Sequence, residues 1–230
     1  FNSDENLKYF TGKNIFSAEN SHLVPNWYRT PASYTAEPLS RNKQTFLVLL
    51  YSGNMYDRID WSLLKNLHDR TPENVRIHLV GTADTALDQL METVGERTKF
   101  VYHGPMRERD LLTFANSCDL ALLPHSIDMH SPYMNPMKVN MYYAIGLPCI
   151  STDVPGIDKD TPNLFVCQTQ EDFINQTISL LGMPRPSVID KSFASSKEQN
   201  YIEIVDTLFL HEDSAKKESQ FPNPSSFYEY

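Results

Sequence analysis

The sequence is poor in residue types that several functional classes require. Only eight of its 230 residues are glycine. It contains no P-loop, no G-x-G-x-x-G dinucleotide-binding pattern and no G-x-S-x-G nucleophile turn. The three cysteines, Cys118, Cys149 and Cys167, are far apart and lie in apolar stretches. Disulfide frameworks and zinc sites use closely spaced cysteines, so we expect free buried thiols and a reducing, cytoplasmic location.

Basic residues and long apolar runs are scarce as well. The chain has 20 Lys and Arg against 29 Asp and Glu, a formal net charge of -9. Nucleic-acid binding needs a basic surface, so we expect no nucleic-acid partner. No apolar run approaches the roughly 18 residues of a membrane-spanning helix. The first residues do not show a basic segment followed by an apolar one, the pattern of a signal peptide. The first residue is Phe1 rather than Met, from which we expect an excised piece of a longer protein.

Apolar runs of strand length alternate with amphipathic segments of helical length between residues 45 and 182. They predict strands at residues 45–52, 75–80, 98–102, 119–123, 148–152 and 164–167, with helices at 60–69, 85–93, 108–117, 136–145 and 169–181. Strands that are apolar throughout and separated by helices indicate a parallel sheet covered on both faces. The predicted fold class is therefore α/β, with a doubly wound, mostly parallel sheet.

Polar residues mark where several of these helices should begin. Asp60 is an expected N-cap, and Thr85 and Thr169 each open a Thr-x-x-Asp capping pattern. Asn135 caps well before Pro136, which is favoured at the first helical position. Outside this region the sequence predicts two further helices, near residues 2–10 and over residues 192–211.

The loops after the strands are where a ligand is expected, because open parallel sheets bind ligands beyond the carboxyl ends of their strands. The long polar loop 124–135 leads into a predicted helix start at Asn135. Free N–H groups and the positive dipole end make a helix start a site for anions. Lys138 adds a full charge in the first turn, which favours phosphate. Extension of Lys138 into solvent is an alternative of equal weight.

An ordered set of short segments carries a family resemblance. The segments are residues 24–26 (VPN), 51–53 (YSG), 58–61 (RIDW), 103–105 (HGP), 118–124 (CDLALLP), 131–138 (SPYMNPMK) and 143–156 (YAIGLPCISTDVPG). In this order they resemble the C-terminal, donor-binding domain of GT-B glycosyltransferases. In that family an N-P-x-K turn leads into a helix that ends E-Y-x-A-x-G-x-P-V-I-x-T-D. The resemblance covers roughly residues 20–210 and implies a Rossmann-like domain.

The resemblance implies an activity and a division of the chain. The activity is transfer of a sugar from a nucleoside-diphosphate sugar to an acceptor, in polysaccharide biosynthesis, with no metal or other cofactor. Only residues 1–23 precede the hinge-like segment 24–26, whereas a complete N-terminal domain needs roughly 100 residues or more. The expected units are residues 1–40, a remnant of the N-terminal domain with the hinge; 41–190, the donor-binding domain; 191–212, a C-terminal helix; and 213–230, a tail.

The missing N-terminal domain, or a partner chain in its place, would supply the acceptor site and the catalytic base or its equivalent. It would also provide any peripheral association with a membrane. No catalytic residue is therefore assigned within this chain, and the chain is not expected to transfer sugar alone.

The resemblance also assigns contacts to the donor, position by position. The assigned residues are, for the base, Gly104, Pro105 and Met106; for the diphosphate, Gly53, Asn54, Arg58, Asn135 and Lys138; and for the sugar, Ser131 and Tyr133. One position departs from the family, because Met141 stands where a carboxylate would accept hydrogen bonds from the ribose. Either another group holds the ribose, or donor binding is weak or absent.

Other clusters have simpler interpretations. His125, Asp128 and His130 share one loop, but no fourth ligand is evident, so phosphate, sugar or solvent contacts are favoured over a metal. Residues 158–160 read Asp-Lys-Asp and resemble a metal-binding carboxylate pair, but a loop after a parallel strand favours a solvated acidic turn. The aromatic residues near the start are interpreted either as packing across the hinge or as a partner surface.

Two rival functions remain beside the transferase. One is a non-catalytic GT-B-like module used for protein assembly, in which Met141 marks a lost ribose contact. The other is a sugar-nucleotide epimerase of the same architecture, which ranks last because its helix lacks the N-P-x-K pattern.

Overall fold

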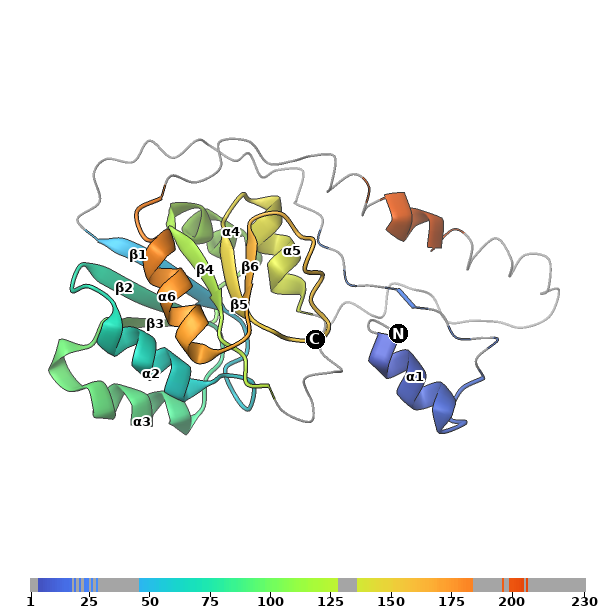
Figure 1. The fold of residues 1–230 in the computed structure, drawn as a ribbon, viewed down its shortest axis with the longest axis horizontal. Helices are drawn as coiled ribbons and strands as arrows, with labels where there is room; N and C mark the ends of the chain where they lie inside the picture. Colours follow the sequence, from blue (N-terminus) through green and yellow to red (C-terminus); the bar gives the residue numbers. More distant parts are fainter. Residues whose placement is uncertain are drawn as a thin grey trace.

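Six parallel strands form the sheet of this protein. The computed structural model describes residues 4–17, 46–127 and 136–183, with isolated positions between 19 and 28 and between 196 and 206. The strands are β1 (Leu47–Ser52), β2 (Val75–Val80), β3 (Phe100–Gly104), β4 (Leu120–Leu123), β5 (Cys149–Thr152) and β6 (Leu164–Cys167). Their order is β3-β2-β1-β4-β5-β6, and all neighbours run parallel. The predicted doubly wound α/β fold is confirmed (Figure 1).

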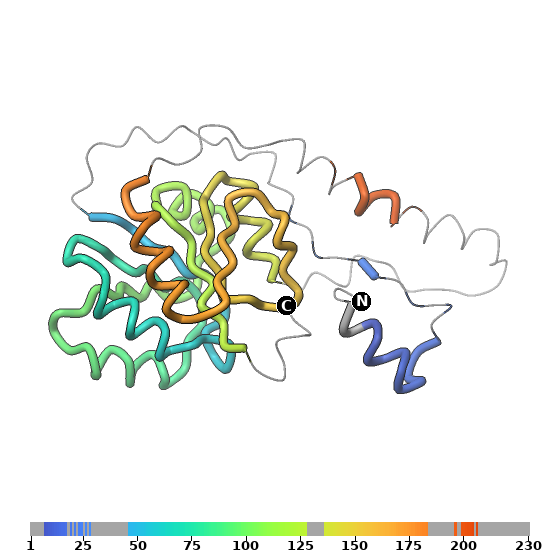
Figure 2. Tube along the Cα trace, in the orientation of Figure 1, coloured from blue at the N-terminus to red at the C-terminus, as the bar shows by residue number. Residues whose placement is uncertain are grey.

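Helices cover both faces of the sheet. They are α2 (Trp61–Arg70), α3 (Thr85–Val94), α4 (Glu108–Ser117), α5 (Met137–Ala144) and α6 (Gln170–Leu180), with a short 3₁₀ turn at Gly95–Arg97. The layer of α2, α3 and α6 lies across the sheet from α4 and α5 (Figure 1 and Figure 2). Arg70 joins α2 to α6, because its guanidinium bonds Glu171 and donates to Asn175 Oδ1 at 2.7 Å.

The described bounds follow the predicted periodicity closely, with β3 as the main exception. The expected strand 75–80, helix 108–117 and strand 164–167 have the predicted limits. The strand expected at 98–102 lies two residues later, at 100–104. The reason is local: Gly95–Arg97 forms a 3₁₀ turn that Thr98 closes by donating its N–H to the Gly95 carbonyl.

Two of the predicted caps are confirmed and two differ. Asp60 accepts the Leu63 N–H at 2.9 Å, and Thr169 accepts the Asp172 N–H at 3.0 Å. Thr85 is not a cap. The carboxylate of Asp84, one residue earlier, accepts from the helix instead, and a carboxylate also suits the positive helix end. Pro136 occupies the cap position of α5 rather than its first helical position.

The regions flanking the sheet are described only in part. Helix α1 spans Asp4–Gly12, close to the helix expected at 2–10. Residues 199–204 are helical, within the predicted helix 192–211. The proposed boundaries after residues 40, 190 and 212 lie outside the described residues. None of the described helices has the length and apolar character needed to cross a bilayer.

The carboxyl ends of β1 and β2 meet through two glycines. Gly81 has φ of +134°, and a Cβ placed on it would lie 1.9 Å from the carbonyl oxygen of Gly53. Gly53 donates its N–H to Val80 O at 2.9 Å, and Met55 donates to Thr82 O at 2.9 Å. The loops after β1 and β2 therefore run side by side with their backbones in contact, which only glycine at position 81 permits.

A buried tyrosine joins α5 to the carboxyl end of β1. Tyr142 is fully buried, and its hydroxyl accepts the Ser52 N–H at 3.0 Å. The same hydroxyl shares a 2.8 Å hydrogen bond with Ser52 Oγ. Burial raises the pKa of Tyr142 well above its usual value, so the hydroxyl stays protonated. This contact sets where the first turn of α5 lies relative to the loop that begins at Gly53.

The close approach at Gly81 predicts a large loss of stability on substitution. Gly81→Ala should lower the free energy of unfolding by about 3 kcal/mol or more, because it adds both a contact with backbone and positive-φ strain. Gly95→Ala is the matched control, since Gly95 has φ of +66° but a Cβ added there would meet no atom within 4 Å, and it should cost only about 1 to 2 kcal/mol. Urea unfolding measures both, and equal losses would contradict the contact.

The Tyr142 hydrogen bonds predict a second effect. Tyr142→Phe should destabilise the chain by about 1 to 3 kcal/mol, because the buried Ser52 N–H loses its acceptor. Tyr56→Phe is the control, since that side chain is 42% exposed, and should change little. The measurement is again urea unfolding; a neutral Tyr142→Phe would show that the hydroxyl does not hold α5.

Candidate functional site

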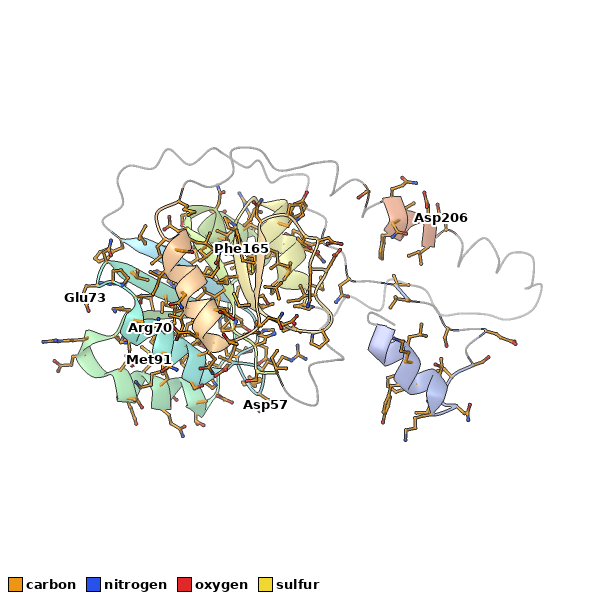
Figure 3. All side chains as sticks on the ribbon, viewed as in Figure 1. Asp57, Arg70, Glu73, Met91, Phe165 and Asp206 are labelled. Carbon is orange, nitrogen blue, oxygen red and sulfur yellow. The ribbon has the colours of Figure 1, made fainter. Side chains whose placement is uncertain are left out.

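The loops after β1 and β4 are bonded to each other at the carboxyl edge of the sheet. Ile59 and His125 form an isolated antiparallel bridge. Asp60 donates its N–H to Pro124 O, and Ser126 donates its N–H to Arg58 O, each at 2.8 Å. Figure 3 shows Asp57, which lies in the β1 loop, at the bottom of the sheet region, away from Glu73, which precedes β2 and lies at the left. Arg58 and His125 are thus neighbours where a ligand is expected.

The β1 loop has a defined conformation that presents three of the predicted residues, Gly53, Asn54 and Arg58. The Tyr51 hydroxyl donates to the Asn54 carbonyl at 2.8 Å, and Asn54 Oδ1 accepts the Tyr56 N–H at 2.9 Å. Burial raises the pKa of Tyr51, and the positive charge of Arg58 opposes that rise. The Arg58 charge therefore acts directly beside the start of the loop.

The carboxyl end of β3 lies next to the carboxyl end of β2. Gly81 donates its N–H to Gly104 O at 2.9 Å, so the backbones of Gly53, Gly81 and Gly104 lie in a row. Pro105 is exposed, and Met106 is partly buried against the core. Gly81 was not predicted as a site residue. Its signal in the sequence is a glycine directly after an apolar strand, the same feature that marks Gly53.

Lys138 lies at the second residue of α5 and is half buried. Burial lowers its pKa, and the carboxylate of Glu108, at the start of α4, acts in the opposite direction. Among the described residues, none forms a hydrogen bond or an ion pair with its ammonium group. A partly desolvated lysine without a bonded anion favours the ligand interpretation over simple extension into solvent.

Met141 lies on the same helix, but in the core. Its side chain is 3% exposed and packs among buried apolar residues. In this structure the position expected to face the ribose is therefore apolar and covered, and a contact with donor stays a prediction. One residue earlier, Asn140 donates to the carbonyl of Asn26 at 2.9 Å, which places Asn26 of the hinge-like segment against α5.

Several predicted residues lie outside the described part of the chain. These are Asp128, His130, Ser131, Tyr133 and Asn135. Within residues 4–17, 46–127 and 136–183, no three His, Cys, Asp or Glu side chains gather as metal ligands would.

The Asp-Lys-Asp turn has a structural role in the described chain. Asp158 Oδ1 accepts the Asp160 N–H at 3.1 Å, and Lys159 pairs with Asp153 at 2.5 Å. These contacts agree with the solvated acidic turn that the sequence favoured. The lysine charge and the Gln168 amide hold the pKa of Asp153 below its usual value.

A histidine pair next to Gly104 was not foreseen. His78 Nδ1 and His103 Nε2 lie 2.8 Å apart, the rings are stacked, and Phe114 of α4 packs against both. Burial, followed by the charges of His103 and Arg76, lowers the pKa of His78 to about 4. The pair holds β2 and β3 together where the base is expected. Its only sequence signals were a histidine within the predicted strand 75–80 and another directly after the predicted strand 98–102.

The expected buried thiols are confirmed. Cys118, Cys149 and Cys167 are free and buried. Burial raises the pKa of Cys149 well above its usual value and, with the Asp172 charge, that of Cys167 to about 11. Neither thiol is a nucleophile at neutral pH.

Solved structures with the same fold include glycosyltransferases. The lipopolysaccharide outer core galactosyltransferase WaaB, in its apo form, is 15% identical with a TM-score of 0.63, covering 91% of this chain and 60% of that one. WaaG, a glycosyltransferase involved in lipopolysaccharide biosynthesis, is 16% identical with a TM-score of 0.60, and the match covers 94% of this chain and 62% of that one. Anabaena Alr3699/HepE, in complex with UDP and glucose, is 15% identical with a TM-score of 0.60, and the match covers 93% of this chain and 60% of that one. At these identities the likeness shows the fold, which is GT-B.

This chain spans about 60% of the length of those relatives. A search of curated proteins gives no significant match. The family model described as glycosyl transferases group 1 matches residues 47–183, which include all six strands and α2 to α6. The chain therefore belongs to the group 1 glycosyl transferases.

Proposed function

We propose that this chain is the donor-binding half of a glycosyltransferase that takes a nucleoside-diphosphate sugar as its donor. The observation that carries the proposal is Lys138, a partly desolvated cation in the first turn of α5 with no described anion bonded to it. Arg58 brings a second positive charge to the same edge of the sheet. A chain with a net charge of -9 thus keeps local cations where a diphosphate would lie.

The proposed chemistry is electrostatic. As the bond between sugar and diphosphate breaks, negative charge grows on the leaving diphosphate. Lys138 and the N–H groups of the α5 start would stabilise that charge, because preorganised donors act strongly where water is excluded. These groups take the place of a metal ion, and an N-terminal half would bring the acceptor and the catalytic base.

The nucleobase of the donor would lie towards Gly104, Pro105 and Met106, and its sugar towards the chain before α5. A donor carrying UDP is favoured by the Anabaena relative, whose structure is a complex with UDP and glucose. WaaB and WaaG are both lipopolysaccharide enzymes, which favours an acceptor among cell-surface polysaccharides. Both points are carried to this chain as proposals.

The rival function is a non-catalytic module of the same fold. The burial of Met141 favours it, because an apolar, covered residue stands where a ribose-binding carboxylate is expected. The two functions differ in a simple respect. The donor-binding half binds a nucleoside diphosphate, whereas an assembly module has no reason to do so.

Lys138→Ala should weaken binding of UDP or GDP roughly tenfold to a hundredfold, the worth of a hydrogen bond to a charged group. Isothermal titration of the 230-residue chain measures it. Lys65→Ala is the control, since Lys65 is an exposed partner of Asp69 on α2. Because burial lowers the pKa of Lys138, affinity should also fall as pH rises through that lowered pKa. Unchanged affinity in Lys138→Ala would contradict the phosphate role.

Met141→Glu tests the ribose position. Without ligand it should lower the free energy of unfolding by about 2 kcal/mol or more, because it buries a carboxyl in apolar surroundings. Burial raises the pKa of that carboxyl above its unfolded value, so the loss should be larger at pH 7 than at pH 4.5. Met141→Leu is the control that keeps the core packing.

The nucleotide response of the same variant separates the two functions. If the chain binds UDP or GDP, Met141→Glu should change an affinity that already exists. Affinity that appears only in Met141→Glu would instead support the non-catalytic module.

A further inference from the structure

His125 is held rigidly at the carboxyl end of β4. Its backbone bridges Ile59 of the β1 loop, and its carbonyl accepts the Thr152 hydroxyl of β5 at 2.8 Å. The next residue, Ser126, donates its N–H to Arg58 O at 2.8 Å. The histidine is thus fixed by the β1 loop on one side of β4 and by β5 on the other, at the carboxyl end of the sheet, where the donor is proposed to bind.

The two ring nitrogens of His125 have different surroundings. The side chain is 6% exposed, and its ring meets Tyr51 edge to face at 6.1 Å. Nδ1 is buried and has no hydrogen-bond partner among the described residues. Nε2 also has no hydrogen-bond partner among the described residues, but unlike Nδ1 it is not buried. The nitrogen that remains accessible is therefore Nε2.

These surroundings decide where the proton lies. A buried N–H without an acceptor loses the hydrogen bond that water gave it, and such orphaned N–H groups are rare in folded proteins. An unprotonated Nδ1 avoids that loss, so the proton belongs on Nε2. The charged ring would need both N–H groups and would face the positive charge of Arg58. Burial, and then the Arg58 charge, lower the pKa of His125 to about 4.

We propose that His125 is a neutral hydrogen-bond donor, protonated on Nε2, that contacts a phosphate oxygen of the nucleoside-diphosphate donor beside Arg58. This proposal rests on the proposed function. A phosphate oxygen is the matching group because the accessible nitrogen offers only an N–H. The adjacent guanidinium also draws negative charge to this position. A sugar hydroxyl would equally accept from an N–H, but it gains little from the cation.

With its proton on Nε2, His125 can donate a hydrogen bond to the ligand but cannot act as a metal ligand or a general base. A metal ligand or a general base must offer a lone pair towards the site. In this tautomer the lone pair of His125 faces the interior, at Nδ1. His125 therefore binds and orients the donor without taking up a proton, and the metal interpretation of the loop at residues 125–130 has no support from this ring.

The tautomer is measured directly, with no ligand present. Long-range ¹H–¹⁵N NMR correlation on the full chain should show His125 as a neutral ring protonated at Nε2 at pH 7 and still at pH 5.5. The missing signal in His125→Gln assigns the peaks. A ring protonated at Nδ1, or one that becomes charged above pH 6, would overturn the proposal.

The contact between His125 and phosphate is tested with amide variants, in which glutamine or asparagine places a polar group near one ring nitrogen. His125→Gln places an N–H near Nε2 and should keep UDP or GDP affinity within about threefold, whereas His125→Asn and His125→Ala should lose roughly tenfold or more. Uridine or guanosine should bind all variants alike, because they lack phosphate. His68→Gln is the matched control, since His68 is 7% exposed and lies at the end of α2, away from this edge. Thermal unfolding confirms that each variant is folded.

The outcomes separate the two proposals. If the unmodified chain binds neither UDP nor GDP, the proposed function fails and the contact fails with it. If nucleotide binds but His125→Ala leaves affinity unchanged, only the contact is overturned. If His125→Ala weakens binding of the nucleoside as strongly as binding of the nucleotide, His125 contacts the nucleobase or the ribose, and the proposed phosphate contact is wrong.

Discussion

The contact between Gly81 and Gly53 is the constraint on which the carboxyl edge of the sheet depends. A side-chain atom at position 81 would lie 1.9 Å from the Gly53 carbonyl oxygen. Because the two backbones touch, the loops after β1 and β2 run together, and Gly104 extends the row through its bond to Gly81. The backbones of the three glycines therefore lie in a row, with the Tyr51 side chain next to Gly53 and the His125 ring against Tyr51. The buried Tyr142 hydroxyl then ties α5, and with it Lys138, to the same edge.

Electrostatics at this edge run against the charge of the whole chain. The net charge of -9 would repel a diphosphate at long range, so binding depends on a few cations placed close to the ligand. Lys138 is partly desolvated and Arg58 acts on the rings of Tyr51 and His125. His125, neutral and beside Arg58, adds a hydrogen-bond donor without adding charge. The edge therefore combines full charges with a donor whose state does not depend on pH near neutrality.

The fold was predictable from sequence because its information is local. Apolar runs and amphipathic spacing placed all six strands, and β3 shifted only because the 3₁₀ turn at Gly95–Arg97 took up the residues before it. The site was predictable only in outline. The expected edge and the grouping of Gly53, Asn54 and Arg58 follow from topology, whereas the approach of Gly81, the His78–His103 pair and the covering of Met141 arise from packing across the sheet. No pattern within one segment encodes such contacts.

The central claim is that a nucleoside diphosphate binds at the carboxyl edge, and amide chemical shifts on titration with UDP and GDP test it most directly. We expect the changes to gather at Gly53, Arg58, Gly81, Gly104 and Lys138. The amides of Glu73 and Lys99, at the opposite edge, should stay still. Changes centred on Glu73 and Lys99, or none at millimolar nucleotide, would contradict the account.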